Sequence, residues 1–247
     1  MATHGDQGTR ALIVAGAGST AEFIGRAFPA FEGVVDEVLP IDPHAGDVEA
    51  ISATLHSEVA RARVDGWRVI IGGVSFGAHA SAAYAADCAP DERPDGLACV
   101  MPAWTGEPDA IAWATASTAS LLQEHGIPAV LDDLEARFPG DWVTAELRLA
   151  WGRRRADDLI AELRAVAACP SPSVPALARI TMPTVVVGLA DDPVHPVKVA
   201  RAWAAAIPGS VLVTHARAEV GVERGRLGRS AFEALASEYQ RSASASQ

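Results

Sequence analysis

Residues 68–86 read RVIIGGVSFGAHASAAYAA, and this stretch decides the expected fold. It begins with a run of Val and Ile, passes through glycines and a serine, and ends in a long run of small residues. A continuous apolar run is typical of a strand that is buried on both faces, and an alanine-rich run favours a helix. The stretch therefore predicts a buried strand, a tight turn and a helix, with Ser75 in the turn.

The turn itself carries a chemical pattern, because Gly73, Ser75 and Gly77 form G-x-S-x-G. Between a strand and a helix, this pattern exposes the serine hydroxyl on a strained turn, and the flanking glycines let the strand and the helix pack closely. A serine at its ordinary pKa is a weak nucleophile and needs a base that an acid orients. We expect Ser75 to be a nucleophile, and an ordinary structural turn is the alternative.

A candidate for the orienting acid follows a second buried run. Residues 184–196 read TVVVGLADDPVHP, so a strand of Val residues ends in an acidic turn. Asp191 and Asp192 both lie there, and we prefer Asp192 as the acid. Aspartate ahead of a proline often caps the next helix, and we expect one of the two to do so.

A glycine-rich loop follows the first expected strand. Residues 11–23 read ALIVAGAGSTAEF, with G-x-G-x-x-A spacing that ends at Ala21. This spacing is typical of a dinucleotide-binding turn, which also requires an acidic residue about 20 positions later. Asp36 and Asp42 lie near that position. The dinucleotide hypothesis explains this loop but neither Ser75 nor the acidic turn.

Together the three motifs resemble the α/β-hydrolase superfamily, and the resemblance covers most of the chain. VAGAGSTAEF looks like the loop after the first core strand, GVSFGA like the nucleophile elbow and ADDPVHP like the acid turn. The resemblance implies that Ser75 is the nucleophile, that Asp192 is the triad acid, and that the backbone N–H groups of Ala17 and Phe76 form the oxyanion hole. The histidine usual in the first loop is replaced by Ala15.

The triad histidine departs from the family pattern, which places it in the loop after the last strand. The last expected strand reads SVLVTH and ends at His215, slightly early for this role. We expect His215 to be the base, with His195 in the acid turn as the alternative and the lack of any general-base histidine as the third possibility. His79, one helical turn after Ser75, is expected to be a packing or capping residue.

Alternating strands and helices predict an α/β fold with a mostly parallel sheet of about six strands. The expected strands span residues 11–15, 34–39, 68–72, 97–101, 184–189 and 211–214. Residues 106–178 contain no good strand and predict a helical cap insertion. The core would then comprise residues 1–105 and 179–240, followed by a disordered tail at 241–247.

The composition limits the partners. The chain has 247 residues, 49% of them hydrophobic, and a net charge of −11, which disfavours nucleic acid and anionic membrane surfaces as partners. The three cysteines indicate reduced thiols in a cytoplasmic protein, and no signal peptide or spanning segment is expected. No metal-ligand cluster or phosphate-binding loop occurs in the sequence, so we expect neither a metal nor a cofactor.

The sequence thus predicts a serine hydrolase that cleaves a small or medium carboxylic ester or thioester through an acyl-enzyme. Its partner would be a small-molecule acyl substrate, and we expect Trp104 and Ser19 to line the pocket. Three alternatives stay open: a lyase or cyclase on the same fold, a non-catalytic binding protein, and a nicotinamide-dependent enzyme. The sequence leaves the oligomeric state open.

Overall fold

A six-stranded parallel sheet forms the centre of the computed structural model, which describes residues 8–245. Its strands run in the order β2-β1-β3-β4-β5-β6, and every neighbouring pair is parallel. Their bounds are β1 (Thr9–Val14), β2 (Glu37–Ile41), β3 (Arg68–Val74), β4 (Gly96–Val100), β5 (Thr184–Leu189) and β6 (Val211–His215). The predicted α/β class and the parallel sheet are confirmed.

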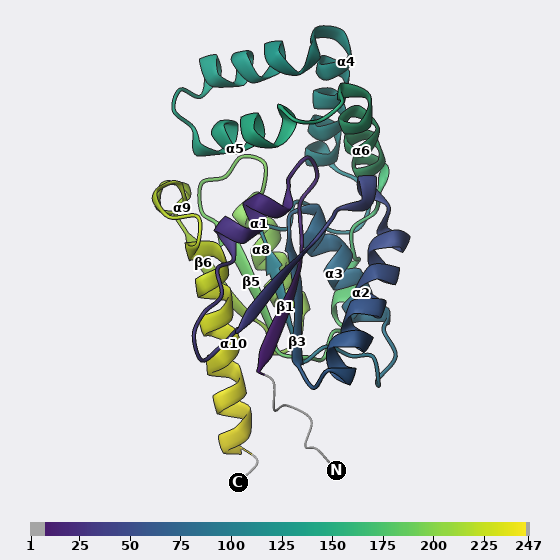
Figure 1. Ribbon diagram of the computed structural model, residues 1–247, viewed down its shortest axis with the longest axis vertical. Helices are drawn as coiled ribbons and strands as arrows, with labels where there is room; N and C mark the ends of the chain where they lie inside the picture. Colours follow the sequence, from purple (N-terminus) through teal and green to yellow (C-terminus); the bar gives the residue numbers. More distant parts are fainter. Residues whose placement is uncertain (1–7, 246–247) are drawn as a thin grey trace.

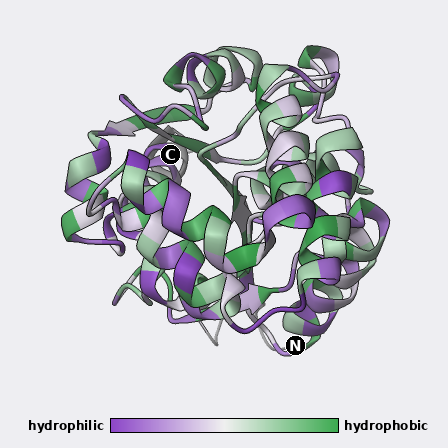
Figure 2. Cartoon of the chain, turned by 90° about the horizontal axis from the view of Figure 1, so that it is seen from above, coloured by the Kyte–Doolittle hydropathy of each residue, from purple (hydrophilic) through white to green (hydrophobic). Residues whose placement is uncertain are grey.

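Helices cover both faces of the sheet, as Figure 1 shows. One face packs against α2 (Val48–Val64), α3 (Phe76–Asp87) and α8 (Val197–Ala206), and the other against α1 (Ala21–Ala27) and α10 (Arg226–Ala245). Seen from above, the helices of the molecule carry both hydrophilic and hydrophobic residues (Figure 2). Helix α2, for example, buries one face against the sheet, whereas α3 is buried along nearly its whole length.

Of the four helices that the described chain has between β4 and β5, three lie beyond one end of the sheet (Figure 1), and we call these three the cap helices. They are α4 (Ala110–Arg137), α5 (Trp142–Trp151) and α6 (Ala156–Ala168). Helix α4 is interrupted at Gly126, where φ is 78°, just ahead of Pro128. The cap helices have a hydrophobic cluster of their own, so they form a separate layer.

Two boundaries differ from the sequence-based expectation. Strand β2 begins at Glu37 rather than at residue 34, because Phe31 and Val35 exchange backbone hydrogen bonds and close a turn first. Helix α10 continues through Ala245, well into the segment predicted as a disordered tail, and residues 246–247 lie outside the described part of the chain.

The remaining elements are short. They are a 3-10 helix η1 (His44–Gly46), α7 (Val174–Leu177) and α9 (Arg217–Val222). Between Gly8 and Ala245, no helix combines the length and the apolar character that crossing a membrane requires.

Candidate active site

Ser75 occupies a strained turn between β3 and α3. Its φ of 55° and ψ of −117° lie where non-glycine residues are rare, and such a conformation costs about 1–3 kcal/mol. A Cβ on Gly73 would lie 2.3 Å from the carbonyl carbon of Gly77, and a Cβ on Gly77 would lie 2.2 Å from the carbonyl oxygen of Val14. Both glycines of the motif are therefore required by close backbone approach.

The strained turn presents Ser75 to a cavity of about 460 Å³ under the cap helices. Five other candidate site residues predicted from the sequence line the same cavity: Ala17, Ser19, Trp104, Asp192 and His195. Most of the remaining lining is apolar. Within residues 8–245, the Ser75 hydroxyl makes no hydrogen bond, so it is available to a bound molecule.

The two predicted oxyanion donors are also available. Ser19 N–H donates to the carbonyl oxygen of Gly16 at 3.0 Å, which closes a tight turn over residues 16–19 with Ala17 inside it. Phe76 is the first residue of α3, where helical N–H groups have no partner within the helix. In the described part of the chain, neither the Ala17 nor the Phe76 N–H donates to a protein acceptor.

Asp192 lies at the carboxyl end of β5 and is only 7% exposed. Its Oδ1 accepts the backbone N–H groups of Val194 and His195, both at 2.8 Å. Burial raises the pKa of this carboxyl, but the His195 ring and the two N–H groups outweigh burial and hold the pKa well below its usual range. Asp192 is therefore ionised in the cavity wall.

The two candidate bases lie in different places. His195 lines the cavity, and its Nδ1 lies 3.3 Å from Asp192 Oδ1 without hydrogen-bond alignment. His215 instead contacts Ser230 on α10, with 2.9 Å between Nε2 and Oγ, and is not part of the cavity lining. The structure therefore does not bring His215 to Ser75, because side-chain alternation along β6 directs it to the α10 face.

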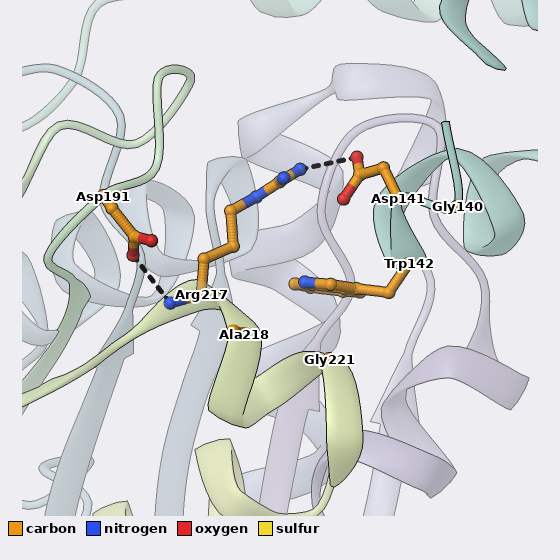
Figure 3. A pocket seen from close by; sticks show the side chains of 7 residues that line it. All are labelled: Gly140, Asp141, Trp142, Asp191, Arg217, Ala218 and Gly221. Carbon is orange, nitrogen blue, oxygen red and sulfur yellow. Dashed lines mark hydrogen bonds and ion pairs between the residues drawn. The ribbon is translucent and has the colours of Figure 1, made fainter. Parts of the chain in front are cut away.

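Arg217, which is not among the site residues predicted from the sequence, lies next to the acid turn (Figure 3). Its backbone N–H donates to Asp191 Oδ1 at 2.6 Å, and its guanidinium donates to Asp141 Oδ2 at 2.7 Å. Its Nε lies 3.4 Å from Asp192 Oδ2. Arg217, which lies two positions after His215 in the sequence, thus connects the acid turn with the residue that precedes α5. The sequence feature that could have pointed to Arg217 is its position just after the last expected strand.

These contacts divide the roles of the two aspartates in the acid turn. Asp191 is exposed and accepts the N–H of Arg217, whereas Asp192 is buried and faces the cavity. A second depression of about 430 Å³ opens beside them and shares Asp141, Trp142 and Arg217 with the first cavity (Figure 3).

His79 is a packing residue beneath the cavity. Its Nε2 accepts the backbone N–H of Ala103 at 3.0 Å, and its ring packs edge-on against Trp104 with 4.6 Å between the centroids. Burial, with a contribution from the nearby His195, lowers the pKa of His79 to about 3. The ring is therefore neutral at physiological pH.

We expect the buried His79 to make the stability of the protein depend on pH. The pKa of His79 in the folded protein lies below its unfolded value of about 6.5. The contribution of His79 to the free energy of unfolding is therefore fully present above about pH 6.5 and is lost as the pH falls towards 3. From about pH 7.5 to about pH 5, the free energy of unfolding should fall by roughly 2 kcal/mol from this group. Urea unfolding of wild type and His79→Gln at both pH values measures it, and an equal pH dependence would contradict the expectation.

Solved structures similar to this chain share its architecture. MenH from S. aureus matches with a TM-score of 0.73 and 17% identity, over 94% of each chain. The enol-lactonase from Burkholderia xenovorans LB400 gives 0.69 and 16%, also over 94% of each chain. A thermophilic esterase from Thermogutta terrifontis gives 0.64 and 16%, over 96% of this chain and 91% of its own. No family model and no curated protein matches the sequence.

Proposed function

Since the chain has the α/β-hydrolase fold, we propose that it is a serine hydrolase that cleaves a small or medium carboxylic ester or thioester. The observation that carries the proposal is the strained turn at Ser75, which exposes an unbonded hydroxyl in the cavity that Asp192 and His195 also line. Strain of this kind persists where the surrounding structure enforces it, and it is common at active sites.

In the proposed reaction, Ser75 Oγ attacks the acyl carbonyl while the N–H groups of Ala17 and Phe76 bind the oxygen that becomes negative. The serine proton moves to His195, which passes it to the departing alcohol or thiol. Water then attacks the acyl-enzyme and gives a proton to His195, which passes this proton to Ser75 Oγ as the carboxylic acid leaves. Asp192, held ionised, stabilises the protonated imidazole.

His195 replaces His215 as our candidate for the base, because it lines the cavity and lies beside Asp192. No hydrogen bond joins it to Ser75 in the described structure. Catalytic hydrogen bonds are often long in free enzymes and tighten when substrate binds, so this geometry is compatible with the role.

The cavity lining favours an uncharged acyl group. Its surface is mainly apolar side chains, several of them from the cap helices. Among the described residues that line the cavity, the one Lys or Arg is Arg217, which pairs with Asp141 and lies close to Asp192, so its charge is compensated. The names of the enol-lactonase and the esterase among the similar structures agree with an ester or lactone substrate.

A panel of short and medium p-nitrophenyl esters and acyl thioesters, assayed with wild type and Ser75→Ala, tests the proposal. We expect turnover of at least one class that depends on Ser75. Turnover that is equal in both proteins, or none across the panel, would count against a serine hydrolase.

A non-hydrolytic enzyme on the same scaffold is the second candidate. It is favoured by Arg217 lying beside Asp192 and by the lack of a hydrogen bond between Ser75 and His195 within the described residues. Such an enzyme would show no acyl transfer to Ser75, which mass spectrometry of the peptide containing Ser75 would detect. A cytoplasmic location, expected from the cysteines, stays a prediction.

A further inference from the structure

The cap helices hold the turn at residues 16–19 through two hydrogen bonds to Gly18. Gly18 N–H donates to Glu162 Oε1 at 2.6 Å, and the carbonyl oxygen of Gly18 accepts Trp151 Nε1–H at 3.1 Å. Glu162 belongs to α6 and Trp151 ends α5. Both backbone polar groups of Gly18 are therefore bound by side chains of the cap.

Glu162 is built into this contact. It is only 1% exposed, and its second oxygen accepts Arg154 NH2 at 2.7 Å. A buried carboxylate is strongly destabilising unless donors satisfy it, and here each oxygen has one. Hydrogen bonds that a backbone N–H donates to a carboxylate are shorter and stronger than those between neutral groups. Glu162 therefore fixes the Gly18 amide.

Because of the geometry of the turn, fixing the Gly18 N–H also restricts the neighbouring residue Ala17. Gly18 has a φ of +67°, and a Cβ there would lie 2.8 Å from Trp151 Nε1, so the turn and the cap pack in direct contact. The Ser19-to-Gly16 hydrogen bond makes the peptide between Ala17 and Gly18 the central unit of the turn. Holding that peptide also holds Ala17, whose N–H is a predicted oxyanion donor.

We infer that Glu162 is a positioning residue that orients the Ala17 N–H and thereby couples oxyanion stabilisation to the docking of the cap. The role in catalysis rests on the proposed function. Loss of a whole oxyanion donor lowers kcat about 100- to 1,000-fold, and a donor that is present but free to rotate should cost less. Because the donor acts on the charge that develops during reaction, kcat should change more than KM.

The kinetic test compares Glu162→Leu and Glu162→Gln with Asp157→Asn, a matched control in the same helix whose carboxylate is exposed. We expect Glu162→Leu to lower kcat for the ester at least about tenfold, with KM changed by less than about threefold. Glu162→Gln keeps an acceptor for Gly18 and should lie between Leu and wild type; it also serves if the Leu variant fails to fold. Unchanged kcat in both Glu162 variants would overturn the inference.

A second measurement needs no substrate. Amide hydrogen exchange of the free proteins should show Gly18 N–H exchanging at least about tenfold faster in Glu162→Leu than in wild type, with the buried amides of β4 unchanged. Equal protection of Gly18 in both proteins would overturn the contact. Lack of Ser75-dependent turnover in wild type would remove the catalytic role together with the proposed function, while faster exchange would still establish the contact.

Discussion

Ser75→Ala is expected to lower kcat/KM for the best ester or thioester at least about 1,000-fold, with little change in KM. Alanine lacks the atom that forms the acyl bond, whereas the cavity walls that bind the substrate stay in place. The residual rate comes from binding and oxyanion stabilisation alone. Steady-state kinetics of the purified proteins measure the effect, and urea unfolding shows whether the variant is folded.

Ser19→Ala is the matched control, because Ser19 is a second serine that lines the same cavity. It does not lie in the strained turn, and its replacement should leave kcat/KM within about threefold of wild type. A Ser75→Ala protein that keeps a tenth or more of the activity would place the reacting group elsewhere.

The second large effect concerns the base. His195→Ala should lower kcat/KM about 100- to 10,000-fold, the range that general acid–base catalysis contributes. His215→Ala should leave it within about threefold, since the His215 ring contacts Ser230 on α10 and lies outside the cavity lining. The two histidines are thus matched variants in one chain.

The reverse order of effects would return the role of base to His215 and would require the loop after β6 to move. Small effects in both variants would mean that no histidine serves as the base. In that case the Asp192 carboxylate would act on the substrate through its charge alone, and this result would support the non-hydrolytic alternative.

The local sequence pattern was enough to predict those parts of the site that lie within one short segment of the chain. The G-x-S-x-G motif between an apolar run and an alanine-rich run predicted the strand, the turn and the helix around Ser75, and the packing around Gly73 and Gly77 gives the physical reason. The buried run that ends at Asp191 and Asp192 likewise predicted an acid at the carboxyl end of β5.

Features that depend on tertiary contacts were not predictable in this way. Glu162 and Gly18 are separated by 144 residues, and nothing in either segment indicates that they pair. Whether His215 faces the cavity or α10 depends on side-chain alternation along β6, where a shift of one position reverses the face that a residue occupies. The start of β2 shifted because a backbone turn at Phe31 and Val35 competes with the strand.

The central claim is that the Ser75 hydroxyl becomes acylated during the reaction. Wild-type protein is mixed with a slowly hydrolysed p-nitrophenyl ester, quenched in acid, digested and analysed by mass spectrometry. We predict that the acyl mass lies on the peptide containing Ser75 and is absent from Ser75→Ala treated in the same way. An acyl group on another residue, or turnover without any acylated peptide, would contradict the account.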